Sequence, residues 1–270
     1  MAYDTLTFDL HGPVAVLTLN RPDKANAMEE AMWHEIRRAM READETPAVR
    51  AVVMKGAGRH FTAGIDLAML EGLAARIRDE DGARGREKLR RLILDLQDTL
   101  TSIERCRKPV IAAVHGACYG GGMDLVTACD LRYCSADAKF SVKEIDVGMT
   151  ADVGTLQRLP RLVGEGMARE LAYTGRVVEG SEAKAIGLVQ RCFDTPAALE
   201  EGVLAIAGAI AAKSPLAVRG CKEMITYARD HSVADGLNYV ATWNAAMLLS
   251  EDLQAAIRAG LTKQAPKFRD

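Results

Sequence analysis

The chain has 270 residues, of which 49% are hydrophobic and 27% are charged. This composition is ordinary for a globular protein and excludes disordered, collagen-like and fibrous chains. The 35 Lys and Arg residues nearly balance the 37 Asp and Glu residues, which gives a net charge of −2. Such a balance argues against general binding to nucleic acid or to an anionic membrane surface, so we expect neither as a partner.

The cysteines and histidines show no pattern of metal ligation. None of the six cysteines forms a CxxC pair, and the five histidines share no short ligand spacing, so no metal site is expected. No signal-peptide pattern opens the chain, and no apolar run approaches the ~20 residues of a membrane span. We therefore expect a cytoplasmic protein of bacterial type with reduced, buried cysteines.

The first two thirds of the chain alternate between strand and helix patterns. Residues 5–10 and 14–19 predict a hairpin around Gly12-Pro13. The remaining predictions are a helix over 26–40, strands over 51–55, 109–114 and 131–134, and a helix from the glycine run at 120–122 to about 129. Strands separated by helices indicate crossover connections, and hence an α/β fold with a largely parallel sheet.

The last third of the chain is helical. Leu199, Val203, Ile206 and Ile210 follow the spacing of an amphipathic helix, which Ser214-Pro215 ends. Further helices are predicted over 216–229 and 233–249, with a shorter one to 259. We divide the chain into a core with the active site, residues 1–200, and a helical C-terminal region, residues 201–270. The apolar faces of that region must pack on the core or on a neighbouring subunit.

One dense run of charges covers residues 76–91 and contains Gly82 and Gly85. Such a run is typical of a solvated, mobile face. The alternative is a flexible wall over a pocket.

Two glycine motifs follow predicted strands. Gly120-Gly121-Gly122 opens a helix, either as a tight turn or as a set of N–H donors that face an oxyanion. The segment 61–67, Phe-Thr-Ala-Gly-Ile-Asp-Leu, is a second glycine turn, which alone would be a plain loop capped by Asp66. Two backbone donors from two loops are the minimum for an oxyanion hole.

Three carboxylates are candidates for proton transfer. Asp124 lies in the first turn of the helix after the glycines, where it could simply complement the helix dipole. Glu144 follows a short strand and could be a solvated charge paired with Lys143. Asp152 stands in a segment otherwise free of charge, so it is either the N-cap of a helix beginning near Val153 or an acid whose pKa is raised by an apolar pocket.

Several segments in the right order resemble the crotonase superfamily, also called the enoyl-CoA hydratase/isomerase family. The matching segments span nearly the whole chain: residues 19–28 (LNRPDKANAM), 63–67 (AGIDL), 108–116 (KPVIAAVHG), 120–125 (GGGMDL) and 128–132 (ACDLR). The resemblance implies a spiral of β-β-α repeats with C-terminal helices that form trimers or a dimer of trimers.

The resemblance also implies the chemistry. It indicates an acyl-CoA thioester as substrate, bound by Gly121 and by a loop of Ala63, Gly64, Ile65, Asp66 and Leu67. The N–H groups of Ile65 and Gly121 would hold the thioester oxygen, since two fixed donors stabilise an enolate by several kcal/mol. No cofactor is expected, because coenzyme A is part of the substrate. Its phosphates have Lys24, Lys263 and Lys267 as candidate partners.

Asp124, Glu144 and Asp152 decide between branches of that family. A typical hydratase has glutamate at both of the first two positions, which hold a water, and glycine at the third. Asp124 is shorter by one methylene, and the full trio is similar to the branch that isomerises 3,5-dienoyl-CoA to 2,4-dienoyl-CoA in fatty acid β-oxidation. Thr150 departs from that pattern, because a small apolar residue is expected there.

If the chain isomerises 3,5-dienoyl-CoA, Glu144 is expected to remove a proton from C2 and Asp152 to protonate C6. Asp124 would tune or orient both. The alternative is an enoyl-CoA hydratase or Δ3,Δ2-enoyl-CoA isomerase of broad acyl range that uses Asp124 and Glu144. A third possibility is a non-catalytic family member that binds RNA or acts in assembly, against which the charge balance and the retained carboxylates argue.

Overall fold

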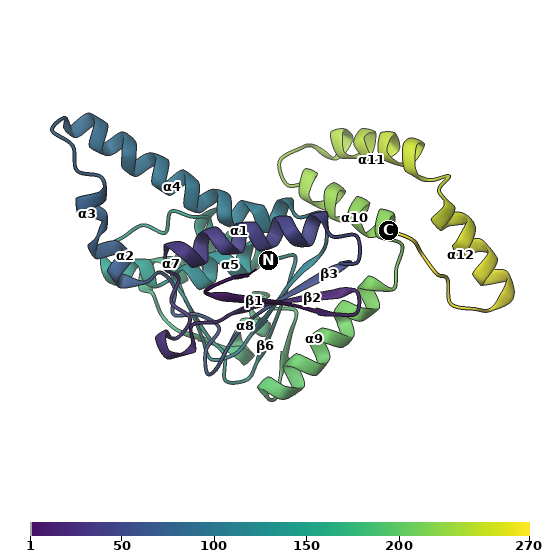
Figure 1. The fold of residues 1–270 in the computed structure, drawn as a ribbon, viewed down its shortest axis with the longest axis horizontal. Helices are drawn as coiled ribbons and strands as arrows, with labels where there is room; N and C mark the ends of the chain where they lie inside the picture. The colour runs from purple at the N-terminus through teal and green to yellow at the C-terminus, as the bar shows by residue number, and fades with distance from the viewer. Residues whose placement is uncertain (1) are drawn as a thin grey trace.

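The computed structural model describes residues 2–270 and contains two sheets (Figure 1). The six-stranded sheet has the order β1-β2-β3-β4-β6-β9, and the three-stranded sheet has the order β5-β7-β8. The large sheet consists of β1 (Leu6–His11), β2 (Val14–Leu19), β3 (Ala51–Gly56), β4 (Val110–Val114), β6 (Leu131–Ser135) and β9 (Arg191–Phe193). The small sheet consists of β5 (Ala117–Tyr119), β7 (Lys139–Ser141) and β8 (Val178–Glu179).

The strand pairing confirms the hairpin and the largely parallel sheet. β1 and β2 pair antiparallel, and every other neighbouring pair in the large sheet is parallel. Successive units place one strand in each sheet and then a helix, as in β4–β5–α5 and β6–β7–η2–α6. This is the predicted spiral of β-β-α repeats.

Helices cover both faces of the large sheet, which explains the continuous apolar strands. In β4, Val110, Ala112 and Val114 face the main core, whereas Ile111 and Ala113 face the second core under α9 (Pro196–Ala211). α1 (Glu30–Glu45), α4 (Gly82–Arg105) and α5 (Gly121–Ala128) contribute buried residues to the main core. Figure 1 shows α9 alone on its side of the sheet.

Shorter helices connect the strands and the long helices. They are η1 (Pro22–Lys24), α2 (Leu67–Glu71), α3 (Leu73–Arg76), η2 (Lys143–Val147), α6 (Thr155–Val163), α7 (Glu165–Thr174) and α8 (Gly180–Ala185). The charge run at 76–91 ends in the first half of α4, which Asp81 caps and which then continues into the core. The run is largely exposed, as predicted, but its Arg76 and Leu89 line the cavity described below, so the alternative of a wall over a pocket is also confirmed. The sequence missed the 24-residue helix.

The first predicted helix begins four residues later than expected, at Glu30. Ala25 and Asn26 have φ angles of +49° and +54°, which a helix cannot continue. The buried Asn26 instead binds the backbone: its amide donates to Ala57 O and His60 O, both at 2.8 Å, and its oxygen accepts from the Arg21 N–H. It thereby holds the loop that leads to residues 61–65.

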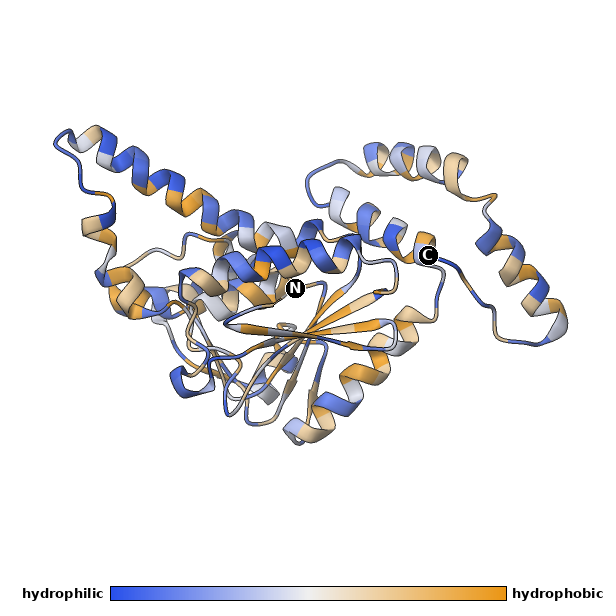
Figure 2. Cartoon of the chain, in the orientation of Figure 1, coloured by the Kyte–Doolittle hydropathy of each residue, from blue (hydrophilic) through white to orange (hydrophobic). Residues whose placement is uncertain are grey.

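The C-terminal region contains α10 (Pro215–Tyr227), α11 (Val233–Met247) and α12 (Glu251–Thr262), as predicted. These helices extend away from the sheets, and Figure 2 shows hydrophobic residues along them. Large apolar side chains of this region are exposed, among them Val233 at 80%, Leu249 at 86% and Leu261 at 82%. Within residues 2–270, no single helix has the length and apolarity to cross a membrane; α9 and α10 pass that test only as a pair bent by 105°.

Candidate active site

The loop after β3 presents the N–H of Ile65. Met28 and Ile65 form an isolated parallel bridge in which the Met28 N–H donates to Gly64 O at 2.8 Å and the Asp66 N–H donates to Met28 O at 3.0 Å. Both bonds of this bridge therefore leave the Ile65 N–H pointing away from Met28. Inside the loop, Thr62 Oγ1 accepts from the Gly64 N–H at 3.0 Å, which fixes the turn.

The second donor is the N–H of Gly121, the first residue of α5. No preceding turn offers it an acceptor, because it is among the first four N–H groups of a helix. The loops touch here: a Cβ on Gly64 would lie 2.7 Å from Tyr119 O and 3.2 Å from Gly121 N. Gly64 has φ +95° and Gly120 has φ +50°, so both turns need glycine.

One cavity of about 250 Å³ brings the two donors and the three carboxylates together. Asp124, Glu144, Asp152, Ile65 and Gly121 all line it. Its remaining wall is mainly apolar and comes from Trp33, Met69, Leu70, Leu73, Arg76, Leu89, Leu92, Ile93, Leu96, Met149 and Val153. Polar groups that converge in an apolar cavity are the usual form of a small-molecule site.

Asp124 is fully buried, and its side chain accepts hydrogen bonds from a residue outside its own helix. Its Oδ1 accepts two hydrogen bonds from Thr155, from the N–H at 2.6 Å and from the hydroxyl at 2.7 Å. Its Oδ2 is buried and has no hydrogen-bond partner among residues 2–270. Burial raises the pKa of Asp124 to about 6, and the two Thr155 bonds limit that rise.

Glu144 lies on η2, directly against the glycine turn. A Cβ on Gly120 would stand 3.3 Å from Glu144 Oε1, and Glu144 Oε2 is buried without a hydrogen-bond partner in the described chain. Burial, followed by the charge of Asp124, raises the pKa of Glu144 to about 7. Lys143 pairs with Asp146 at 2.6 Å, so the alternative of a Lys143–Glu144 pair is wrong.

Asp152 lies in the loop before α6, and its cap interpretation is wrong. α6 begins at Thr155 with Gly154 as its N-cap residue, and Asp124 supplies the carboxylate that binds the Thr155 N–H. The Asp152 side chain is left to face the cavity, where burial raises its pKa. Its carbonyl accepts from the Gln97 amide at 2.6 Å, which ties the loop to α4.

The other predicted residues divide between the cavity rim and more distant surfaces. Asp66 caps α2 and pairs with Arg21 at 2.9 Å, which lowers its pKa. Leu67 is 62% exposed, and Ala63 lines a separate groove of about 1260 Å³ on the α9 side of the sheet. Lys24 lies near Asp66. Lys263 is the C-cap of α12, which lies at the opposite end of the molecule from α2 and α3 (Figure 1), and Lys267 lies in the segment that runs from α12 back to Arg50 and Arg219.

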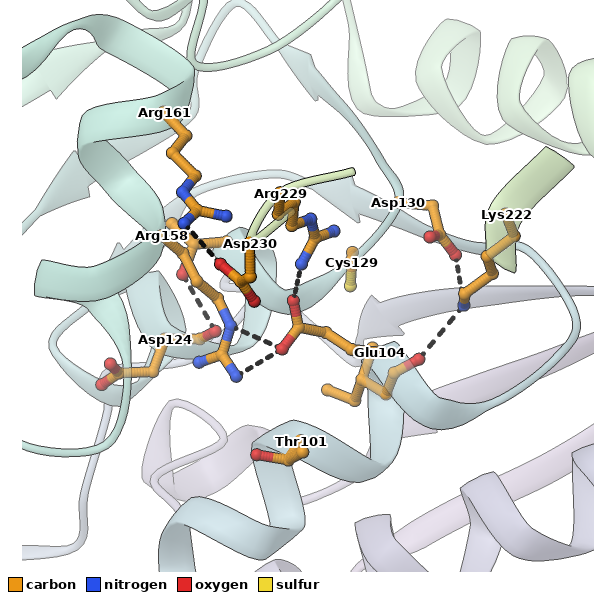
Figure 3. A network of polar contacts seen from close by, with 12 residues as sticks. Thr101, Glu104, Asp124, Cys129, Asp130, Arg158, Arg161, Lys222, Arg229 and Asp230 are labelled. Atoms are coloured by element: carbon orange, nitrogen blue, oxygen red, sulfur yellow. Dashed lines mark hydrogen bonds and ion pairs between the residues drawn. The ribbon is translucent and has the colours of Figure 1, made fainter. Parts of the chain in front are cut away.

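Sequence reasoning missed Thr155 and Arg158. Arg158 binds Glu104 through Nε at 3.0 Å and Nη2 at 2.6 Å, and Arg229 approaches the other oxygen of Glu104. Figure 3 shows Glu104 between these two guanidinium groups, with Asp124 close by. The segment at 155–160 (TLQRLP) carried no signal for this role, because the partners come from distant parts of the chain.

Together, the spiral fold and a cavity that pairs two main-chain donors with buried carboxylates define an α/β enzyme of the crotonase fold. The chain belongs to the enoyl-CoA hydratase/isomerase family, whose model matches residues 9–270. Among solved structures, it is similar to an enoyl-CoA hydratase from Bacillus anthracis, with a TM-score of 0.90 and 31% identity over 98% of this chain and 99% of that one.

Two curated relatives are about half identical to this chain. One is a peroxisomal Delta(3,5)-Delta(2,4)-dienoyl-CoA isomerase from Arabidopsis thaliana, 50% identical over 93% of this chain and 91% of the relative. The other is a mitochondrial Delta(3,5)-Delta(2,4)-dienoyl-CoA isomerase from Homo sapiens, 50% identical over 89% of this chain and 74% of the relative.

These relatives correct one expectation. We expected a cytoplasmic protein of bacterial type, but the relatives at about 50% identity carry peroxisomal or mitochondrial locations in their names. The expectation rested only on the fact that no targeting pattern was recognised, which is weak ground for a location.

Proposed function

We propose that this protein is a Δ3,5-Δ2,4-dienoyl-CoA isomerase of fatty acid β-oxidation, as its relatives' names suggest. The observation that carries the proposal is the third carboxylate. Asp152 lines the same cavity as Asp124 and Glu144 and does not cap α6. A reaction that moves a proton between distant carbons needs two acids at separate positions, and this cavity has them.

The thioester oxygen binds to the N–H groups of Ile65 and Gly121. Removal of a proton from C2 turns this oxygen into an enolate oxyanion, and fixed donors stabilise the charge as it develops. The acyl chain then runs along the cavity past the carboxylates toward the apolar wall of α2, α3 and α4.

Glu144 is the base and Asp152 is the acid. Glu144 takes the C2 proton, the electron pair moves along the chain to form C2=C3 and C4=C5, and Asp152 gives its proton to C6. Burial raises the pKa of both carboxyl groups, that of Glu144 to about 7, which brings them toward the range that suits proton transfer. Solvent then restores both protonation states.

Asp124 orients and tunes the other two. Its charge raises the pKa of Glu144, and Asp152 in turn raises that of Asp124, so the trio titrates as a group. Proton transfer of this kind needs no metal or redox cofactor, and we propose none beyond the coenzyme A of the substrate.

The C-terminal region supports an oligomer as a further part of the proposal. Val233, Leu249 and Leu261 are each at least 80% exposed, and large exposed apolar surface is typical of a protein interface. A homotrimer or a dimer of trimers would cover it. The division at residues 200 and 201, which falls within α9, stays a prediction.

One ultraviolet assay tests the function. The purified protein is given 3,5-octadienoyl-CoA and, in parallel, crotonyl-CoA. We expect rapid growth of the conjugated 2,4-dienoyl absorbance and slow loss of the crotonyl signal. Fast crotonyl hydration without diene conversion would instead favour a hydratase that uses Asp124 and Glu144, an activity named for a relative from Syntrophomonas wolfei at 36% identity.

A further inference from the structure

Thr155 occupies an unusual place in this site, because one residue gives both its N–H and its hydroxyl to a single carboxylate oxygen. The acceptor is Asp124 Oδ1, 31 positions earlier in the chain. Both residues are 0% exposed, so water does not compete for these bonds. Hydrogen bonds to a charged acceptor in such a setting are the strong ones.

The arrangement leaves the two oxygens of Asp124 different. Oδ1 already accepts two donors, whereas Oδ2 is buried without a hydrogen-bond partner among residues 2–270. A proton on Asp124 therefore resides on Oδ2, since protonation of Oδ1 would sacrifice a bond from Thr155. Thr155 thus fixes both the rotation of the carboxylate and the oxygen that carries its proton.

Thr155 is itself held by the helix that it begins. One turn later, Arg158 binds Glu104 of α4, and Arg229, just beyond α10, binds the same carboxylate (Figure 3). The side chains of Arg158 and Glu104 are only 15% and 16% exposed, so this ion pair is well shielded from water. α6 is therefore anchored at the turn that carries Thr155.

We propose that Thr155 is a positioning residue of the isomerase, which acts through its hydroxyl to orient Asp124 and to keep the proton of the neutral carboxyl on Asp124 Oδ2. This inference rests on the proposed function for its kinetic consequence. Its structural consequence, the state of the Asp124 carboxyl in the free enzyme, does not depend on any substrate.

The test compares three variants of the full-length chain. Thr155→Val keeps the shape and the N–H but removes the hydroxyl, and Thr155→Ser keeps the hydroxyl. Thr127→Val is the matched control, because the buried Thr127 hydroxyl donates at 3.2 Å to the main-chain carbonyl of Asp124 and not to its carboxylate. Thermal unfolding of each variant shows that it is folded.

The kinetic readout is kcat on 3,5-octadienoyl-CoA. We expect Thr155→Val to lower kcat by on the order of 10- to 100-fold with little change in KM, as a misplaced catalytic group does. Thr155→Ser should stay within a fewfold of the wild type, and Thr127→Val should match the wild type. Equal losses in Thr155→Val and Thr127→Val, or no rescue by serine, would overturn the proposal.

The second readout is the titration of Asp124 in the free enzyme, followed by carbon-13 spectroscopy of labelled aspartate and assigned with Asp124→Asn. Glu144 and Asp152 on the cavity side and Arg158 on the α6 side are the charged groups that act on it. Loss of a donor to the carboxylate disfavours its charged form, so Thr155→Val should raise the pKa of Asp124 above about 6, whereas Thr155→Ser should not.

The two readouts separate the failure of this inference from that of the proposed function. If the wild type fails to convert the dienoyl substrate, the proposed function is wrong. The titration still tests whether the Thr155 hydroxyl stabilises the charged carboxylate of Asp124. An unchanged Asp124 titration in Thr155→Val would refute the positioning role whichever reaction the enzyme catalyses.

Discussion

The two walls of the cavity are built in different ways. The wall with Ile65, Gly121, Asp124 and Glu144 is set by close main-chain contacts and buried hydrogen bonds. The opposite wall comes from α2, α3 and the first half of α4, and exposed ion pairs such as Arg76–Glu30 hold it in place. In the proposed mechanism the chemistry takes place where geometry is fixed, and the acyl chain binds where only apolar surface is required.

The largest effect is expected for Asp152→Asn, which tests whether the chemistry depends on the carboxylates of this cavity. The amide cannot give a proton to C6, so we expect kcat for dienoyl-CoA isomerisation to fall by on the order of 10³-fold, within the range for general acid catalysis. Asp146→Asn on the exposed side of η2 is the matched control and should retain activity. A loss below tenfold in Asp152→Asn would remove this residue from the catalytic set.

The fixed wall is tested next at Gly64. A Cβ there would lie 2.7 Å from Tyr119 O at a φ of +95°, so Gly64→Ala must displace the Ile65 N–H. Loss of one oxyanion donor lowers kcat by roughly 10²- to 10³-fold, and we expect a loss of this size. Gly166→Ala, which has open space around its Cβ, is the control. Comparable activity in both variants would mean that Ile65 does not bind the thioester oxygen.

The third prediction concerns stability. The pKa of Glu144 is about 7 in the folded chain against an ordinary value of 4.5. Between these values the unfolded chain releases a proton that the folded chain keeps, so this group makes stability fall as pH rises. Glu144→Gln should therefore raise the free energy of unfolding at pH 8 by about 2 kcal/mol.

Urea denaturation at pH 8 and at pH 5 measures this effect. The gain should shrink markedly at pH 5, where the folded wild type holds Glu144 protonated and neutral. A gain of the same size at both pH values would show that burial of charge is not its cause.

The smallest effect belongs to the apolar wall. Arg76 pairs with Glu30 through two bonds of 2.6 and 2.8 Å, but both side chains are more than two-fifths exposed. Exposed pairs contribute ~0.2–1 kcal/mol, so Arg76→Met should change KM for the dienoyl substrate by less than about fivefold and leave kcat unaltered. Arg169→Met, at an exposed pair on α7, is the control. A large fall in kcat in Arg76→Met would mean that the apolar wall takes part in the chemical step.

The sequence predicted elements whose signals are local. Alternation in 5–10, the β-branched run at 14–19, the apolar run at 109–114 and the helical spacing of Leu199 to Ile210 each became the expected element. It missed α4, because two glycines and a dense charge run obscured the periodicity of its first half. It also began the first helix too early, at Asn26, whose left-handed backbone is set by distant carbonyls.

The same distinction applies to the site. The membership of Asp124, Glu144, Asp152, Ile65 and Gly121 in one cavity was predicted through the family resemblance, and their roles stay a prediction. Sequence reasoning left open whether Asp152 caps α6, because it could not show that the carboxylate bound to the first N–H of α6 comes from Asp124 on another helix. Interactions between positions 31 residues apart leave no trace in a local pattern.

In the proposed mechanism Asp124 therefore has two functions: it orients and tunes the other carboxylates, and it accepts the hydrogen bonds at the start of α6. This double use constrains which substitutions the site can tolerate. A change to glutamate, the residue expected at this position in hydratases, would lengthen the side chain and displace its oxygen from Thr155. Because the two residues are in direct contact, the effects of substitutions at 124 and 155 should be non-additive.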